Sequence, residues 1–148
     1  MSISVRNMLR CEHNRDGHKF LVMFNWCVSI IGLGIDYVKK GFWTDYASIP
    51  RLLWFWYDPL DYREEGTLHD WLYKEQKWNG QAITRKQADE ILFKFVLQKH
   101  GRRVARDFYY GVRIGGRKPW NKYKKDRRIK NERIHRNLLN KIDNKIKG

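Results

Sequence analysis

Four polar residues in the middle of this chain have types and spacing that could support chemistry. His69 is followed directly by Asp70, Tyr73 lies four residues after His69, and Asp89 follows a short linker. An imidazole held in one tautomer by a carboxylate can take a proton from water. Asp70 could give oxygen ligands to a hard cation such as calcium, which would polarise a carbonyl. The pattern therefore indicates a hydrolytic site with His69 as its base and Asp89 as the group that orients it.

A structural interpretation of the same residues stays open. A buried helix histidine that is satisfied by a carboxylate stabilises many protein cores without any chemistry. Arg85, four residues before Asp89, could form an ordinary helix-surface ion pair worth about 0.3 to 0.5 kcal/mol. Alternatively, Arg85 is the charge that keeps Asp89 ionised, which is the interpretation we favour.

A second polar group precedes this region. Thr44, Asp45 and Ser48 read as a turn in which Asp45 caps backbone amides, and this structural role is favoured over ligation. If Asp45 instead faces Asp70, it becomes a second ligand for the cation.

Capping signals predict two helices around these residues. Asp61 with Glu64, and Thr84 with Gln87, each have the spacing of an N-cap and its reciprocal partner. The linker over 77–81 contains an Asn-Gly turn signal. We therefore expect an antiparallel helix hairpin.

The N-terminal third has the pattern of a sheet. Apolar residues alternate over 20–30 with the period of a strand. Gly32 and Gly34 mark a turn, after which 35–39 should pair back as a hairpin strand and 42–44 continue it. The sequence thus predicts a small antiparallel sheet.

The rest of the chain completes an α+β domain over 1–116, followed by a basic tail over 117–148. One further helix is expected over 104–114, before Gly115 and Gly116. A chain of 148 residues fits one domain with a modest core. It has no apolar run long enough to span a membrane, and its N-terminus lacks the apolar stretch of a signal peptide. We expect a protein made in the cytoplasm.

The tail holds most of the positive charge. It contains thirteen lysine or arginine residues against three acids, which is +10 of the formal +15. Ile134, Leu138, Ile142 and Ile146 recur every four residues beside Leu139, as on an amphipathic helix. Such a helix needs a partner, which could be another protein chain, an anionic membrane or nucleic acid. The candidate binding residues in the tail are Arg127, Arg128, Lys130, Arg133 and Arg136.

Four aromatic residues stand together ahead of the first predicted helix. Such large rings cannot all point inward from one short loop, so some of them should be exposed. We favour a protein interface over a lipid headgroup region for them. These residues are Trp54, Phe55, Trp56 and Tyr57.

The run His69-Asp70-x-x-Tyr73, with Ala88-Asp89 after it, resembles the catalytic helix pair of the phospholipase A-two superfamily. The disulfide-free form in parvovirus capsid proteins is the most similar. The resemblance implies that His69 is the general base, that Asp70 binds calcium, and that Tyr73 and Asp89 support the histidine. The glycine-rich calcium loop of that superfamily has no clear counterpart upstream.

A wider resemblance covers about residues 18–116. The runs 41–50, 69–73 and 85–89 together resemble an uncharacterised domain family that is common in tailed-phage genomes. This resemblance implies a phage origin and supplies no activity.

Two functions follow from these patterns. We favour a virion-associated structural or assembly protein that docks on neighbouring phage proteins or packaged DNA through its aromatic residues and basic tail. The alternative is a calcium-dependent, phospholipase-like hydrolase that acts on host membrane lipid. Neither function requires a small-molecule cofactor.

Overall fold

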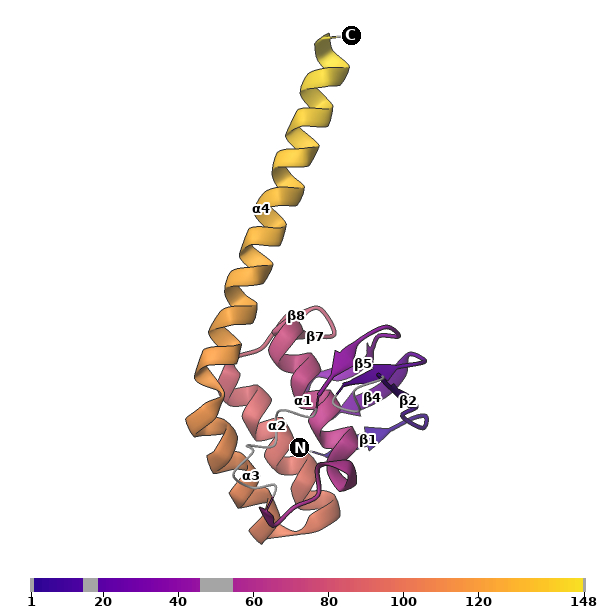
Figure 1. Ribbon diagram of the computed structural model, residues 1–148, viewed down its shortest axis with the longest axis vertical. Helices are drawn as coiled ribbons and strands as arrows, with labels where there is room; N and C mark the ends of the chain where they lie inside the picture. Colours follow the sequence, from indigo (N-terminus) through magenta and orange to yellow (C-terminus); the bar gives the residue numbers. More distant parts are fainter. Residues whose placement is uncertain (1, 15–18, 46–54, 148) are drawn as a thin grey trace.

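The computed structural model describes residues 2–14, 19–45 and 55–147, and has the expected α+β arrangement. Short antiparallel strands from the N-terminal part lie on one side of helix α1, and helices α2 and α3 lie on its other side (Figure 1). The final helix projects well beyond the rest of the molecule. In the described part of the chain, none of the helices combines the length and apolar character needed to cross a membrane.

The first sheet contains the predicted hairpin. Strands β1 (Ile3–Val5), β4 (Trp26–Ile30) and β5 (Gly34–Val38) form an antiparallel sheet in the order β1-β4-β5. The turn between β4 and β5 needs left-handed backbone, which Gly32 and Gly34 adopt with φ of 92° and 87°. The prediction that this segment pairs back on the preceding strand is confirmed.

The alternating segment over 20–30 forms two strands. The chain forms β3 (Phe20–Val22) and then breaks before β4. Phe24, in the break, is 56% exposed, so the alternation of buried residues is interrupted there. The polar side chain of Asn25 accepts a hydrogen bond from the amide of Lys40 at 2.9 Å, and this contact belongs to a corner rather than to a strand.

The second sheet contains the 42–44 segment, which was predicted to extend the hairpin. Strand β2 (Cys11–His13) pairs with β3, and β3 pairs with β6 (Trp43–Thr44) on its other side. The 42–44 segment is therefore extended, but it does not continue β5 as predicted. Its partner is β3, to which it returns after Gly41 turns the chain with φ of 85°.

Helix α1 (Arg63–Glu75) does not begin with the predicted cap. A 3-10 turn, η2 (Pro59–Tyr62), precedes it, and the Asp58 side chain caps that turn by accepting a hydrogen bond from Leu60 N at 2.9 Å. Asp61 lies inside the turn and is not an N-cap. Pro59, just after Asp58, suits the start of the turn because its missing N–H would have no partner there.

The linker after α1 forms a two-stranded ribbon. Strands β7 (Lys77–Trp78) and β8 (Gln81–Ala82) pair antiparallel around the predicted Asn-Gly turn. Asn79 and Gly80 have φ of 46° and 76°, as expected for the two central residues of a tight hairpin turn. The short ribbon reverses the chain between two helices.

Helices α2 (Arg85–His100) and α3 (Arg102–Gly115) follow, separated by Gly101. The Lys99 ammonium near the end of α2 contacts Glu64 near the start of α1, so these two helices run antiparallel. Thr84 forms the predicted capping box, because its hydroxyl accepts from Gln87 N and the Gln87 side chain accepts from Thr84 N. The helix hairpin and the further helix are confirmed.

Replacing Thr84 by alanine should lower the free energy of unfolding by about 1 kcal/mol, because the Gln87 amide in the first turn of α2 loses its acceptor. Urea denaturation followed by circular dichroism measures this change. Thr84→Ser retains the hydroxyl and should stay close to the wild-type protein. Equal stability of both variants would contradict a role for the cap.

Helix α4 (Arg117–Lys147) begins at the predicted boundary, but its first turns pack on the domain. Trp120 packs on the core, and its carbonyl accepts a hydrogen bond from Gln76 Nε2 at 2.8 Å. Arg127 donates hydrogen bonds to the carbonyl of Glu75, at the end of α1, and to the Gln76 side chain. A cation at a helix C-terminus is favourable, so this contact fixes α4 against α1.

Candidate active site

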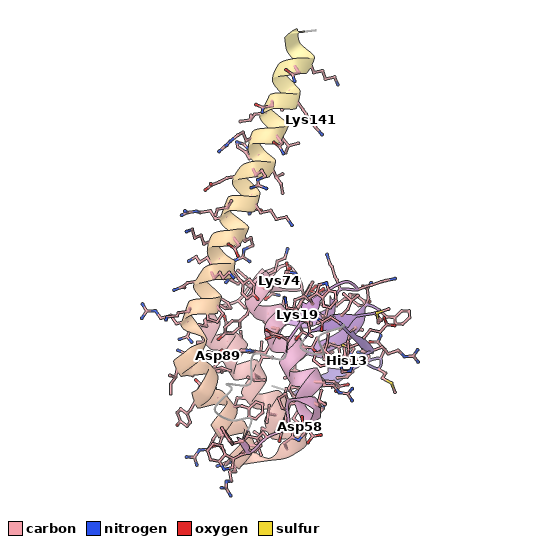
Figure 2. All side chains as sticks on the ribbon, in the orientation of Figure 1. His13, Lys19, Asp58, Lys74, Asp89 and Lys141 are labelled. Atoms are coloured by element: carbon pink, nitrogen blue, oxygen red, sulfur yellow. The ribbon has the colours of Figure 1, made fainter. Side chains whose placement is uncertain are left out.

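Asp89 is the centre of a buried network between three helices. Its side chain is fully buried on α2, inside the helical layer (Figure 2). Its Oδ1 accepts a hydrogen bond from the Tyr73 hydroxyl at 2.6 Å and lies 3.0 Å from His69 Nε2. Its Oδ2 lies 2.7 Å from Arg113 Nη1 and 3.6 Å from Arg85 Nη1. The predicted contact between His69 and Asp89 is confirmed.

This network keeps Asp89 ionised. Burial by itself would raise the pKa of Asp89, but hydrogen bonds from His69, Tyr73 and Arg113 outweigh it and hold the pKa below its ordinary value of 3.8. Burial, followed by the hydrogen bond to Asp89, raises the pKa of Tyr73. Tyr73 is therefore a protonated donor to a charged carboxylate.

The charge on Asp89 determines the tautomer of His69. An ionised carboxylate only accepts hydrogen bonds, so His69 Nε2 carries the hydrogen in this contact. In the neutral ring, Nδ1 is then the nitrogen that can accept a proton. The His69 ring is 2% exposed and lies against the Tyr73 ring, with 4.2 Å between centroids. The side chain is therefore held in one orientation.

His69 and Tyr73 also line a cavity of about 320 Å³. Asp70 and Asp45 line the same cavity, so the candidate base and both candidate cation ligands share one space. The rest of the lining comes from the end of α3 and the start of α4. It consists of Gly111, Val112, Gly115, Gly116, Pro119, Lys122 and Tyr123.

The acidic side of the cavity is organised by Thr44. Its hydroxyl donates a hydrogen bond to Asp70 Oδ2 at 2.5 Å. Burial raises the pKa of Tyr123, which also lines the cavity, and the charges of Asp70 and Asp45 raise it further. Both carboxylates therefore act electrostatically on the same part of the cavity. Ser48, predicted to support them, lies outside the described residues.

A calcium ion takes six to eight oxygen ligands. Across the residues that the structure describes, no group of three or more His, Cys, Asp or Glu side chains could hold a metal ion. Asp70 and Asp45 bring the carboxylate oxygens that a hard cation prefers. They fit calcium only as part of a shell that water, backbone or substrate oxygens complete.

Two arginines neutralise Asp89, and only Arg85 was predicted to do so. Arg113, on α3, lies closer to Asp89 than Arg85 does. The Arg85 guanidinium also donates to the carbonyl oxygens of Val112 at 3.4 Å and Arg113 at 3.1 Å, so it ties α2 to the end of α3. Nothing in the spacing of the sequence distinguishes Arg113 from the many other basic residues.

The backbone of Gly116 lies close to the Tyr73 hydroxyl. A Cβ atom at Gly116 would overlap that hydroxyl and would lie 2.5 Å from the Val112 carbonyl oxygen. Gly115, next to it, has open space around the same position. The two neighbouring glycines therefore form a matched pair for substitution.

Gly116→Ala should lower the free energy of unfolding by about 1 to 3 kcal/mol, as overpacking in a well-packed interior does. The added methyl group must displace Tyr73 from Asp89 or shift the start of α4. Gly115→Ala should not lower it, and urea denaturation of both variants measures the difference. Equal destabilisation by the two substitutions would contradict the close contact with Tyr73.

The aromatic residues predicted to form an interface divide into two groups. Phe55 is 88% exposed and Trp56 is 72% exposed. Tyr57 is half-buried, and its hydroxyl donates to Asp107 Oδ2 on α3 at 2.6 Å. Trp54 lies outside the described residues. Tyr57 thus anchors a segment in which the two preceding rings face solvent.

The five basic residues predicted to bind a partner also differ among themselves. Arg127 is engaged by the end of α1, as described above. Arg128 lies 3.5 Å from Glu132 in an exposed ion pair. The remaining three are exposed on α4: Lys130, Arg133 and Arg136.

Comparison with known families places most of this helical network inside a shared domain. Residues 29–112 match the model of a family described as a protein of unknown function, DUF1353. The chain belongs to this family. The prediction that the chain contains a domain of an uncharacterised family is confirmed. The family description supplies no activity. The match includes His69, Tyr73 and Asp89 and ends before α4. No curated protein and no solved structure matches the chain.

Proposed function

We propose that this protein is a hydrolase in which His69 is the general base. The observation that supports the proposal is the buried contact between His69 and an ionised Asp89 at the wall of a cavity. A purely structural histidine needs only the carboxylate contact. Here the same ring also lines a cavity beside two further carboxylates.

The residues of the network have separate roles in this proposal. His69 Nδ1 takes a proton from water while the water oxygen attacks the carbonyl carbon of an ester. The ester C–O bond then breaks, and the proton returns from His69 to the departing alcohol oxygen. Asp89 stabilises the charged imidazolium between these steps, and Tyr73 keeps Asp89 in position. Each group acts from an orientation that the folded chain fixes before substrate binds.

Asp70 and Asp45 are the residues that would hold a cation, and calcium is the one we propose. When bound, calcium would polarise the ester carbonyl. Thr44 would keep the Asp70 carboxylate oriented through its hydrogen bond.

The substrate that we propose is a phospholipid ester of the host membrane. Val112 and Pro119 give the cavity apolar surface for an acyl chain, and Lys122 adds a cation to its lining. A lysine ammonium suits a phosphate group. The cavity therefore combines apolar surface and a cation with the carboxylates of Asp45 and Asp70.

The test is fatty-acid release from vesicles of mixed anionic phospholipids, with calcium and with a chelator. The proposal predicts calcium-dependent release that Asp70→Asn reduces. Asp126→Asn, a matched change in an exposed acid on α4, should leave the rate unchanged. Absence of release, or release that resists the chelator, would contradict a calcium-dependent phospholipase.

A second function is supported by separate surfaces. Phe55 and Trp56 are highly exposed, and the far part of α4 presents basic and apolar residues to solvent. We propose on this basis that the protein also takes part in phage virion assembly, on neighbouring virion proteins or packaged DNA. If DNA is the partner, affinity for duplex DNA should fall steeply with salt. A flat salt response would remove DNA as the partner.

A further inference from the structure

One face of helix α4 packs on the domain in the first turns and is exposed to solvent further along the helix. Trp120, Arg127 and Ile134 are seven residues apart in succession, which is close to two helical turns each, so they lie on the same face. Trp120 and Arg127 contact the domain, and the helix then projects beyond it (Figure 1). Leu138 and Ile142 follow at intervals of about one turn. The face that packs on α1 therefore continues as an apolar stripe.

The stripe has no cover within the described chain. Ile134, Leu138 and Ile142 each leave about half of their surface exposed. The first turns of the same face are covered by Tyr73, whose ring packs edge-on against Trp120 at 5.1 Å between centroids. An occupant of the stripe would therefore extend an existing interface.

The charges beside the stripe limit what that occupant can be. Between 128 and 142 the helix has five basic residues and one acid, Glu132. A second copy of α4 would bring these like charges together, which costs energy. An acidic partner would pair with them. The basic residues near the stripe are Arg128, Lys130 and Lys141, whereas Arg133 and Arg136 lie on the other side of the helix.

The shape of the molecule restricts the occupant further. The domain stands on the side of α4 to which Trp120 and Arg127 point, so the stripe lies in the angle between the helix and the domain. A flat bilayer that touched the whole stripe would meet the domain. Nucleic acid would pair with the basic residues but would leave the apolar side chains without apolar partners.

We infer that the projecting part of α4 is a docking surface for an acidic amphipathic helix of a partner protein. Apolar residues of that helix cover Ile134, Leu138 and Ile142, and its acids pair with the basic residues that flank the stripe, Arg128, Lys130 and Lys141. This inference rests on the assembly function proposed above and does not depend on the hydrolase. It names the chemistry of the partner that the tail recognises.

The test measures binding of the full chain to two labelled synthetic peptides by fluorescence anisotropy. One peptide is an acidic helix with leucines at the spacing of the stripe. The other has the same composition with the leucines scrambled. The first should bind about tenfold more tightly, because only it buries apolar surface together with charge.

Matched variants of α4 separate the stripe from charge alone. Ile134→Gln with Leu138→Gln should weaken binding of the first peptide by about tenfold. Ile129→Gln should leave it within about twofold, because this exposed residue lies five positions, or about 140°, from Ile134 and half a turn from Leu138. Circular dichroism of the variants verifies that the helix remains.

Several outcomes would overturn the inference. One is equal affinity for the two peptides, which would show that charge alone drives binding. Others are stripe-dependent binding to vesicles containing phosphatidylserine, and a dimer in analytical ultracentrifugation that the stripe variant loses. Failure with the peptides while salt-dependent DNA binding persists would overturn this inference and leave the assembly function in place.

Discussion

Replacing His69 by glutamine should lower the rate of ester hydrolysis by about a hundredfold or more, the range expected when a general base is lost. Glutamine can still donate a hydrogen bond to Asp89, but its side chain cannot take a proton from water. The hydrogen bonds around Asp89 should therefore persist while ester hydrolysis is lost. The measurement is the initial rate of fatty-acid release at saturating calcium.

The matched control is His135→Gln, because His135 is exposed on the far part of α4. Its rate should equal that of the wild-type protein. Urea denaturation of both variants shows whether the lost activity comes from lost folding. A folded His69→Gln protein that retains the wild-type rate would remove His69 as the base.

The second large effect is on stability. Asp89→Asn should lower the free energy of unfolding by about 3 kcal/mol, because it leaves Arg113 and Arg85 beside a neutral amide in place of a carboxylate. This loss of about 3 kcal/mol lies at the lower end of the range for broken buried ion pairs, since the Arg113 side chain is 30% exposed. Urea denaturation at neutral pH measures the change.

Glu90→Gln is the matched acid-to-amide change. Glu90 is next in the sequence, and its carboxylate lies 3.8 Å from Lys86 in an exposed pair. It should change stability by less than about 1 kcal/mol, as surface ion pairs do. Equal effects at the two positions would contradict the central role of the buried carboxylate.

The stabilisation of the folded protein by Asp89 should weaken as pH falls. Its pKa in the folded protein lies below its ordinary value of 3.8. The stabilisation is therefore present above 3.8 and is lost as pH falls through the lower folded value. The difference in stability between the wild-type protein and Asp89→Asn should narrow in acid, and denaturation at several pH values would show this.

The sequence predicted the core of the candidate site because local signals determined it. Thr84 and the Asn79-Gly80 turn place the start of α2 shortly after the end of α1, and an antiparallel hairpin then brings His69 close to Asp89. Capping and turn chemistry act over a few residues, so they can be read without knowledge of tertiary contacts.

The parts that the sequence did not predict depend on long-range packing. Arg113 reaches Asp89 from α3, and Lys122 and Tyr123 reach the cavity from α4. The break between β3 and β4 likewise depends on hydrogen bonds to segments distant in the chain, such as that of Asn25 with Lys40. No spacing rule connects residues brought together by separate elements.

The start of α1 shows how a local signal can mislead. Asp61 and Glu64 have the spacing of a capping box, but Asp58 and Pro59 begin a 3-10 turn earlier in the chain. The helix then continues from that turn without a side-chain cap of its own. Two overlapping capping signals competed, and the one supported by proline prevailed.

The central claim is that an ionised Asp89 holds His69 with its proton on Nε2, so that Nδ1 can accept a proton. Long-range proton–nitrogen NMR correlation of the wild-type protein at neutral pH reports which ring nitrogen carries the hydrogen. The account predicts a protonated Nε2 and an unprotonated Nδ1 for His69. A neutral ring with its hydrogen on Nδ1 would contradict it.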